Sequence, residues 1–175
     1  LLGAIALTGL VIRVVYLFAY SRHQLFGGDP AYFYYWGAVQ FARGHGFLSF
    51  STFLYDYPTP SAHHPPGFIV LLGGLYKIGL HSPNQLRLAM CVLGAITIVV
   101  VGVLLTKLVS KRAGLIGAAI FATYPNVWLS DTQLMSETLS IFGFVVALTF
   151  VYSFHRRPSV PKIVGASVGF TIAAL

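Results

Sequence analysis

Charged side chains are scarce in this sequence. Asp, Glu, Lys and Arg make up only 9% of its 175 residues, whereas 57% are apolar, and a typical soluble domain has about 25% charged residues. An ordinary soluble protein is therefore excluded, and the high apolar content also excludes a disordered chain. The single cysteine, Cys91, lies within an apolar run, which excludes a disulfide scaffold and a cysteine-based metal site. What remains is an integral membrane protein.

Common nucleotide and metal motifs are missing as well: there is no P-loop, no G-x-G-x-x-G and no zinc motif. The net charge of +7 would suit a nucleic acid, but the basic residues are spread over the ends of apolar segments. Membrane topology and anionic lipid explain that pattern. We therefore exclude nucleic acid as a partner and expect contacts with membrane lipid.

Long apolar runs are what the sequence does have. A membrane-spanning helix needs about 20 mostly apolar residues, and we predict spans over 1–20, 88–106, 113–130 and 138–154, with the start of another over 163–175. The run 66–80, about 15 residues long, has the length of an interfacial or re-entrant helix. The sequence begins at Leu1 rather than Met, and both ends lie in apolar runs. We therefore expect the N-terminal part of a longer, all-α polytopic membrane protein.

Two basic clusters predict the orientation in the membrane, and two predicted spans separate them. Both clusters therefore lie on one side, which the positive-inside rule makes cytoplasmic. The segment 21–87 then forms a large external loop with helices near 30–43 and 66–80, and we expect the protein in the plasma membrane with its active site facing outward. The first cluster is Lys107, Lys111 and Arg112, the second is Arg156, Arg157 and Lys162, and the four acidic residues placed outside are Asp29, Asp56, Asp131 and Glu137.

Asp29 belongs to the helix-start signal Gly27-Gly28-Asp29-Pro30, with Asp at the N-cap and Pro at the first helical position. The predicted helix that follows is rich in Tyr and Trp, which favours the membrane–water interface. A carboxylate at that place can take a proton from a hydroxyl as a general base. Capping of the helix by Asp29 is the equally supported alternative.

Glu137 lies at the head of a predicted span, where the positive end of the helix dipole stabilises a carboxylate. Together with Asp131 it predicts a second acidic site. N-terminal capping of that helix, from Ser130 or Asp131 to Glu137, is the alternative explanation.

His63 and His64 suit a metal, a hydrogen bond to phosphate, or an ordinary loop. Adjacent histidines rarely ligate one ion, and no H-x-x-x-H or nearby carboxylate supports a metal, so a divalent metal stays one alternative among these. Arg13 lies inside the first span, where a charge costs about 2.5–3.5 kcal/mol on insertion scales. We expect it to pair with an acid or an anionic lipid head, or else to extend toward the interface.

Three segments resemble membrane glycosyltransferases of the GT-C superfamily: G-G-D-P-A-Y-F-Y-Y-W from Gly27, H-H-P-P-G-F from His63, and the stretch from R-L-A-M-C at Arg87 to A-T-Y-P at Pro125. They are most similar to glycosyltransferase family 39 and its Rgt-like branch. That branch includes dolichyl-phosphate-mannose protein mannosyltransferases, and the aminoarabinose transferase of lipid A is a relative. The resemblance implies a transmembrane helix bundle with a large first external loop carrying juxtamembrane helices.

The same resemblance implies roles for individual residues. The catalytic base of the family lies near the start of the first external loop and corresponds to Asp29, and the acid of the next external turn corresponds to Glu137. The H-P-P element lies close to where relatives hold the donor phosphate. On this interpretation Arg87, Arg43 or His64 stabilises the departing phosphate. Together with His63 and Asp131, which the sequence itself indicates, these are the residues expected for donor-phosphate or substrate binding.

The implied activity is inverting transfer of a sugar from a polyprenyl-phosphate donor to a hydroxyl of a glycolipid, glycan or protein acceptor, on the extracytoplasmic face. A transporter or flippase of lipid-linked sugars is the main alternative, and a structural subunit is another. A transporter would carry its binding groups near the middle of the membrane on broken helices. The acids of this sequence instead lie in predicted loops or at the start of a span.

Overall fold

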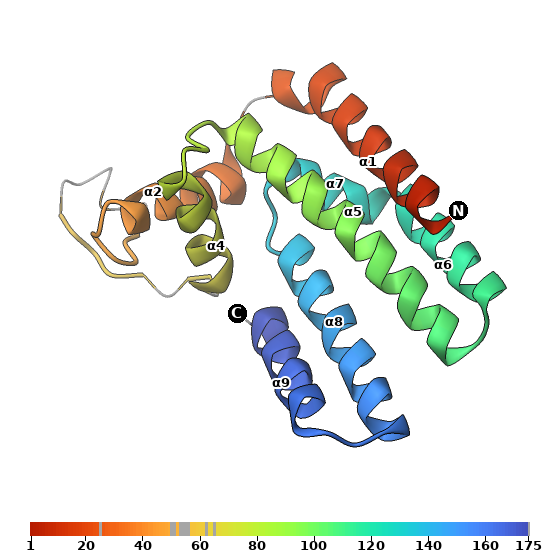
Figure 1. Ribbon diagram of the computed structural model, residues 1–175. Helices are drawn as coiled ribbons and strands as arrows, with labels where there is room; N and C mark the ends of the chain where they lie inside the picture. The colour runs from red at the N-terminus through yellow and green to blue at the C-terminus, as the bar shows by residue number, and fades with distance from the viewer. Residues whose placement is uncertain (25, 50–51, 53–56, 62, 65, 175) are drawn as a thin grey trace.

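The structure is a computed structural model that describes residues 1–24, 26–49, 52, 57–61, 63, 64 and 66–174 (Figure 1). Its described part is helical, which confirms the predicted all-α fold. Asp56 lies outside the described residues. The helices are α1 (Leu2–Ala19), the 3-10 turn η1 (Ser21–His23), the π-helix η2 (Pro30–Tyr35), α2 (Trp36–Ala42), α4 (Pro66–Lys77), α5 (Pro83–Leu108), α6 (Lys111–Thr123), α7 (Pro125–Gln133), α8 (Glu137–Arg156) and α9 (Val160–Ala174).

Three helical segments are long and apolar enough to cross a membrane: Leu2–His23, Pro83–Leu108 and Glu137–Arg156. With 26 residues, α5 is about 39 Å long at 1.5 Å per residue, which exceeds the hydrocarbon thickness of about 30 Å. On α1, Leu7, Val11 and Val15 are 61%, 51% and 58% exposed. This open apolar stripe, repeated every fourth residue, suits a helix that faces lipid, and the chain is an integral membrane protein.

The segment 113–130, predicted as a span, is not one continuous helix. The structure divides it into α6 and α7, with Tyr124 in an extended conformation and Pro125 at the start of α7. A residue before proline is disfavoured in the α region because the proline ring clashes with its backbone. With 13 residues, α6 is about 20 Å long and is too short to cross the hydrocarbon alone.

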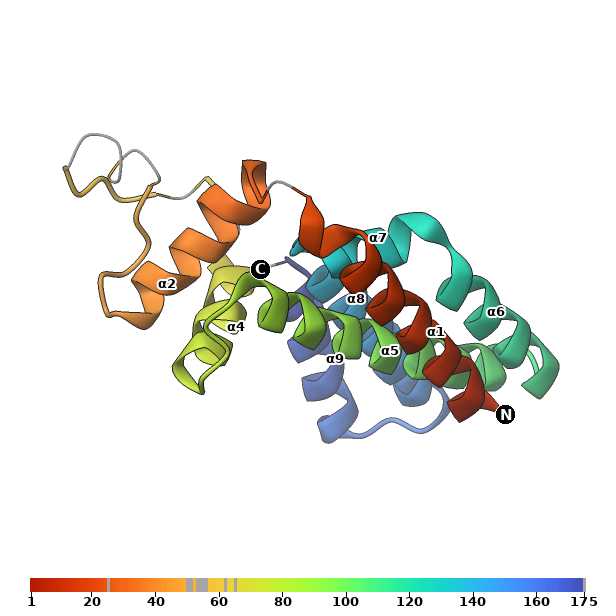
Figure 2. The same cartoon turned by 90° about the horizontal axis from the view of Figure 1, so that it is seen from above.

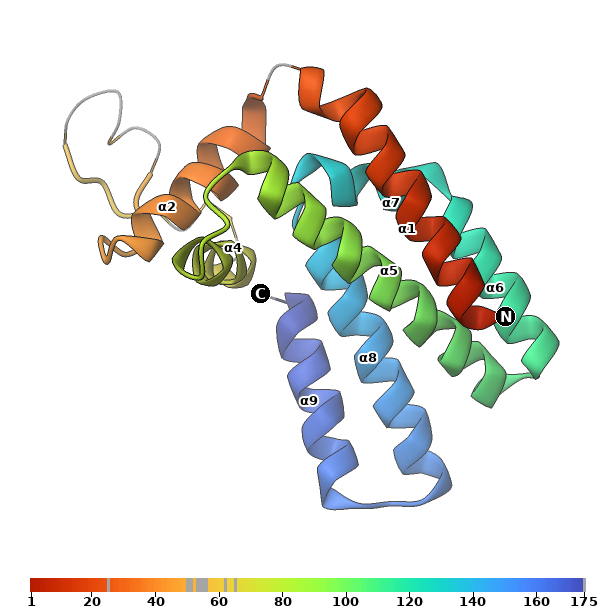
Figure 3. The ribbon, with the colours of Figure 1, turned by 45° about the horizontal axis from the view of Figure 1, so that its top comes forward.

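The bundle is assembled from closely packed helices. α1, α5 and α6 lie side by side, and α8 and α9 form a hairpin next to α5 (Figures 1 and 3). Small residues allow these contacts: a Cβ on Gly143 of α8 would lie 2.7 Å from the carbonyl oxygen of Gly169 on α9. Such small-residue interfaces are typical of helix packing in membranes, where backbones approach closely.

The helices of the predicted external loop form a separate pair, α2 and α4, at the start of α5 (Figure 2). The predicted helices near 30–43 and 66–80 correspond to η2 with α2 and to α4. A buried apolar cluster connects this pair to the bundle. Its members come from η2, α2, α4, α5 and the α7–α8 turn, and they are Tyr34, Ala38, Phe68, Ile69, Leu72, Leu86, Met90 and Leu134.

Candidate functional site

Arg13 and Asp131 form a buried ion pair inside the bundle. The distance from Arg13 Nε to Asp131 Oδ2 is 2.6 Å, and Asp131 Oδ1 accepts a 2.8 Å hydrogen bond from Thr138. Arg13 Nη1 also donates to the carbonyls of Gly9 and Ala122. The expectation that Arg13 pairs with an acid is therefore confirmed.

The pair removes Asp131 from the candidate site. Asp131 is 1% exposed, and both of its carboxylate oxygens accept hydrogen bonds from protein side chains, so neither oxygen is open to a substrate in this arrangement. The physical reason is that an unpaired arginine inside the bundle would be very costly, and Asp131 neutralises it. Gly94 of α5 makes room for the two side chains, because a Cβ there would collide with the Asp131 carboxylate.

The capping explanations for the other acids are also not supported. Asp29 precedes η2 but its side chain makes no cap hydrogen bond, and the N-cap of α8 is Ser136, again without a side-chain cap bond. Ser130 instead donates to the carbonyl of Asn126. Both Asp29 and Glu137 are exposed. Within the described part of the chain, neither carboxylate has an ion-pair partner.

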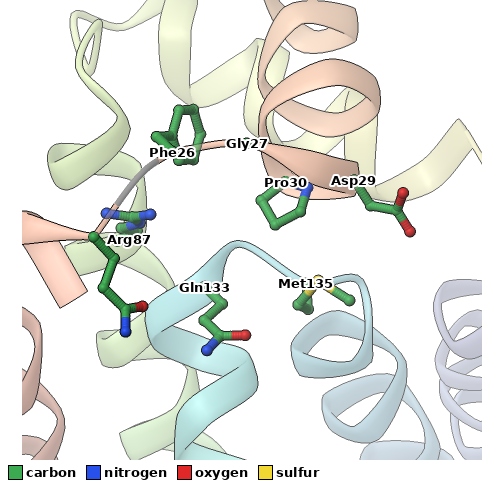
Figure 4. A pocket seen from close by; sticks show the side chains of 8 residues that line it. Phe26, Gly27, Asp29, Pro30, Arg87, Gln133 and Met135 are labelled. Carbon is green, nitrogen blue, oxygen red and sulfur yellow. The ribbon is translucent and has the colours of Figure 1, made fainter.

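Asp29 lines a pocket of about 330 Å³ at one end of the bundle. Three parts of the chain build it: the segment that links α1 to η2, the first turns of α5, and the α7–α8 turn. Figure 4 shows Asp29 and Arg87 at opposite ends, with Gln133 and Met135 between them on the lower side. The lining residues are Gln24, Phe26, Gly27, Asp29, Pro30, Arg87, Gln133 and Met135.

Arg87 is buried in this pocket without a counter-charge. It is 6% exposed, its guanidinium lies 4.8 Å from the centre of the Phe26 ring, and Nη1 donates to the Ser21 carbonyl at 3.3 Å and to Asn84 Oδ1 at 3.2 Å. Its Nε has no hydrogen-bond partner within the described residues, which also hold no carboxylate paired with it. Arg13 Nη2 is also buried without a partner among the described residues, but Arg13 has the Asp131 carboxylate beside it. A buried cation without a counter-charge, as at Arg87, calls for an anionic ligand.

Tyr34 connects the first loop to the turn that carries Glu137. Its hydroxyl lies 3.0 Å from Ser136 Oγ and 3.3 Å from His64 Nδ1. Burial raises the pKa of Tyr34 above its ordinary 10.0, the hydrogen bond with Ser136 lowers it, and the Glu137 and Asp29 carboxylates raise it again. The contact with Ser136 brings η2, which follows Asp29, next to the start of α8, where Glu137 lies.

The α7–α8 turn owes its shape to Leu134. This residue has φ 58° and ψ 55°, the left-handed conformation, which costs a residue with a Cβ about 1–2 kcal/mol. Complete burial of its side chain in the apolar cluster offsets that cost. As a result the neighbouring Gln133 and Met135 line the pocket.

The remaining predicted residues lie elsewhere. His63 and His64 pack near the Phe33 ring, at 5.7 Å and 4.7 Å between ring centres, and neither lines the Asp29 pocket. Arg43 is exposed after the end of α2, roughly 20 Å along the helix from Asp29. No group of three His, Cys, Asp or Glu side chains suited to a metal occurs in the part of the chain that the structure describes.

Sequence reasoning missed the uncharged members of the site. Gln24, Gln133 and Ser136 are ordinary polar residues in the sequence, and only the turn at Leu134 brings two of them to the site. Tyr34 was noted only as one of several aromatics. The π-helical conformation of the segment after Asp29 had no signal in the sequence, although π-helical turns often mark functional sites.

Fold and pocket together define the class of the molecule. It is a helical integral membrane protein with a free carboxylate and an uncompensated cation in one pocket at an end of its bundle. The uncompensated cation makes the site suited to an anionic substrate.

The chain belongs to the dolichyl-phosphate-mannose-protein mannosyltransferase family, whose model matches residues 63–175. No curated protein and no solved structure matches it. The family confirms the resemblance seen in the sequence, and the helical fold is consistent with the GT-C fold. The chain is accordingly a glycosyltransferase that takes a sugar from a lipid-phosphate carrier, which decides against the transporter alternative. The matched part includes Arg87 and Glu137, whereas Asp29 precedes it.

Proposed function

We propose that the protein transfers a sugar, with inversion, from a polyprenyl-phosphate donor to an acceptor hydroxyl, and that Asp29 is the general base. The observation that carries this proposal is the position of Asp29 and Arg87 at opposite ends of one pocket (Figure 4). A single displacement needs its base and its leaving group on opposite sides of the reacting carbon. A pocket with a carboxylate at one end and a cation at the other suits that requirement.

Arg87 is the proposed site of the donor phosphate. The guanidinium is buried, lacks a counter-charge and keeps an unpaired Nε. A phosphate oxygen would supply both the missing charge and the missing acceptor. Hydrogen bonds between arginine and phosphate are among the strong ones, and they stabilise best where negative charge grows as the bond breaks.

The proposed reaction is a single displacement at the anomeric carbon of the donor sugar. The Asp29 carboxylate takes the proton of the acceptor hydroxyl while the acceptor oxygen forms a bond to the anomeric carbon. The bond from that carbon to the phosphate oxygen breaks, and polyprenyl phosphate leaves with one more negative charge beside Arg87. Because phosphate is a good leaving group, no nucleotide site is needed.

Glu137 is proposed as a second carboxylate of the same site. It is exposed at the first position of α8, next to Ser136, whose hydroxyl lies 3.0 Å from Tyr34. This position suits hydrogen bonds from hydroxyl groups of the sugar or of the acceptor. His64 is proposed to act through Tyr34, which lies between it and Ser136.

We also propose which side of the membrane the Asp29 pocket faces, and this proposal rests on the distribution of basic residues. Lys107 from the first predicted basic cluster lines one hollow together with three residues of the second: Arg156, Arg157 and Lys162. The clusters thus meet at the end of the bundle opposite Asp29. By the positive-inside rule that end is cytoplasmic, and the Asp29 pocket faces outward.

The test compares wild type with Asp29→Asn in membranes of cells that express the protein. The substitution keeps the size of the side chain and removes the base. We expect the initial rate of transfer of labelled sugar from polyprenyl phosphate to fall by about 100-fold or more at matched protein levels.

Lys77→Gln serves as the matched control, because it removes an exposed charge at the end of α4, outside the pocket. It should transfer sugar at the wild-type rate. An Asp29→Asn variant with the wild-type rate would refute the role of Asp29. In that case Glu137→Gln becomes the decisive variant for the identity of the base.

A further inference from the structure

A second hollow lies at the other end of the bundle and has no role in the proposed reaction. It has a volume of about 300 Å³ and is formed by the last turns of α5 and α8, the link between α8 and α9, and the first turn of α9. We call it the basic hollow. Its lining residues are Lys107, Tyr152, Ser153, Arg156, Arg157 and Lys162.

The lengths of α5 and α8 give the separation between this hollow and the Asp29 pocket. Arg87 lines the pocket and Lys107 lines the hollow, and both belong to α5. The twenty residues between them span about 30 Å of helix, which equals the thickness of the hydrocarbon core of a bilayer. Along α8, Glu137 and Arg156 are separated by a similar length. The basic hollow therefore lies at the opposite membrane surface.

The hollow concentrates positive charge that no carboxylate balances. Four of its six lining residues are cationic. Of the acids that the structure describes, Asp29 and Glu137 belong to the other end of the bundle, and Asp131 is buried inside it beside Arg13. Within the described chain, the ion pair of Arg13 with Asp131 is the one salt bridge, and it does not involve these cations.

Internal contacts hold parts of the hollow in place. Lys162 Nζ donates to the carbonyls of Ser153, at 3.0 Å, and of Arg157, which fixes the α8–α9 link. The Arg156 guanidinium lies 5.3 Å from the centre of the Tyr152 ring. Arg156, Arg157 and Lys107 are exposed, so their polar ends are available to a ligand.

Exposed apolar side chains lie beside these cations on the same helical ends. Val151 on α8 is 43% exposed and Ile163 on α9 is 49% exposed. A soluble anion makes no use of such neighbours, whereas acyl chains attached to a phosphate do. Basic pockets between transmembrane helices bind anionic lipid head groups in this way.

From this placement we propose that the basic hollow is a binding site for the phosphate head group of an anionic phospholipid, with the acyl chains along α8 and α9. The site is separate from the donor site and independent of which residue is the catalytic base. The phosphate diester would accept hydrogen bonds from Arg156 and Arg157, and Lys107 would add charge.

The test uses the purified protein in neutral detergent micelles, titrated with phosphatidylglycerol or with phosphatidylcholine. Bound lipid is counted by native mass spectrometry. For wild type we expect retention of phosphatidylglycerol at concentrations at which phosphatidylcholine is not retained. Equal retention of the two lipids would overturn the proposal without any variant.

The variant arm compares two pairs of basic residues on the same side of the membrane. Arg156→Gln with Arg157→Gln removes two charges from the hollow, and Lys111→Gln with Arg112→Gln removes two charges from the exposed start of α6, which does not line it. We expect the apparent affinity for phosphatidylglycerol to fall about tenfold or more in the first pair and to stay unchanged in the second. An equal loss in both pairs would show attraction to surface charge alone and would contradict the site.

Inorganic phosphate provides the third arm. It is added to the wild-type complex with phosphatidylglycerol at matched ionic strength, with sodium chloride as the comparison. We expect no displacement of lipid beyond that caused by the salt. Displacement by inorganic phosphate alone would identify a site for soluble phosphate and overturn the assignment to lipid.

Discussion

Two arginines are buried in the described part of the chain, and their surroundings are opposite. Arg13 lies in the middle of the bundle with Asp131 at 2.6 Å and two backbone carbonyls as further acceptors. Arg87 lies at one end of the bundle with a carbonyl, an amide oxygen and an aromatic ring, but no carboxylate. Each arginine keeps one buried nitrogen without a partner among the described residues, Arg13 Nη2 and Arg87 Nε. Arg13 has a carboxylate as its counter-charge, whereas Arg87 has none among those residues. The comparison separates a structural charge from one that is available to a substrate.

The difference also explains why only one of the two acids of the α7–α8 region belongs to the proposed site. Asp131 is turned into the bundle and used by Arg13 and Thr138, whereas Glu137 is exposed six residues later. Burial of a charge is tolerated when it is paired and hydrogen-bonded. Exposure without a partner is what a carboxylate needs to meet a substrate.

The largest effect on stability is expected at the Arg13–Asp131 ion pair. Asp131→Ala leaves the Arg13 charge buried and unpaired, which destabilises a protein by roughly 3–5 kcal/mol. We expect a loss of folded protein in membranes and a lower unfolding temperature in detergent. The double variant Arg13→Met with Asp131→Ala should recover much of that stability, because no charge is left unpaired. A double variant less stable than Asp131→Ala alone would show that the two charges are not coupled.

At Arg87 we expect a smaller effect on stability and a large effect on activity. Arg87→Gln keeps a polar side chain and removes the cation, so transfer of sugar should fall by about 100-fold while the amount of folded protein stays close to wild type. The matched control is Arg22→Gln, an exposed arginine of η1 outside the pocket. Loss of folded protein in Arg87→Gln equal to that in Asp131→Ala would erase the distinction between the two arginines.

The smallest effect is expected at Tyr34, which lies between the acids. Tyr34→Phe removes the contacts with Ser136 and His64, each worth about 1 kcal/mol, so transfer should fall by about thirtyfold. Ser136→Ala removes one of the two contacts and should lower transfer by about fivefold. An unchanged rate in both variants would contradict a positioning role.

Tyr34 also makes the free energy of unfolding depend on pH, because its pKa is raised in the folded protein. Because the folded protein holds the phenol proton more tightly than the unfolded chain, the stabilisation is fully present below 10.0 and is lost as pH rises through the higher folded pKa. The difference in unfolding free energy between wild type and Tyr34→Phe should therefore be constant through neutral pH and shrink in strong alkali. A difference that changes around neutral pH would contradict the Tyr34 phenol as the titrating group.

The helices could be predicted because each depends on a local pattern. Apolar runs of sufficient length define α1, α5 and α8, and the aromatic segment after Pro30 and the run after Pro66 define the helices of the first loop. The break between α6 and α7 also had a local signal, Tyr124-Pro125. It was missed because the hydrophobicity of 113–130 continues through the proline.

The site could be predicted only in part because its other half depends on contacts between distant residues. Asp29 was found from the helix-start signal that contains it, and Arg87 entered only through the resemblance to the family. The pairing of Arg13 with Asp131 joins residues 118 positions apart, and no periodicity in the sequence encodes it. Gln133 and Ser136 gain their importance from the left-handed turn at Leu134, a conformation that leucine rarely adopts and that no sequence rule would assign to it.

The same separation of 118 positions has a consequence for how the protein is made. At a synthesis rate of about 5–20 residues per second, Asp131 follows Arg13 out of the ribosome after roughly 6 to 24 seconds. During that interval the first helix carries a charge for which the nascent chain has not yet supplied a partner. α1 must therefore wait, shielded by water or by the insertion machinery, until α7 arrives, and the order of synthesis determines when the bundle can close.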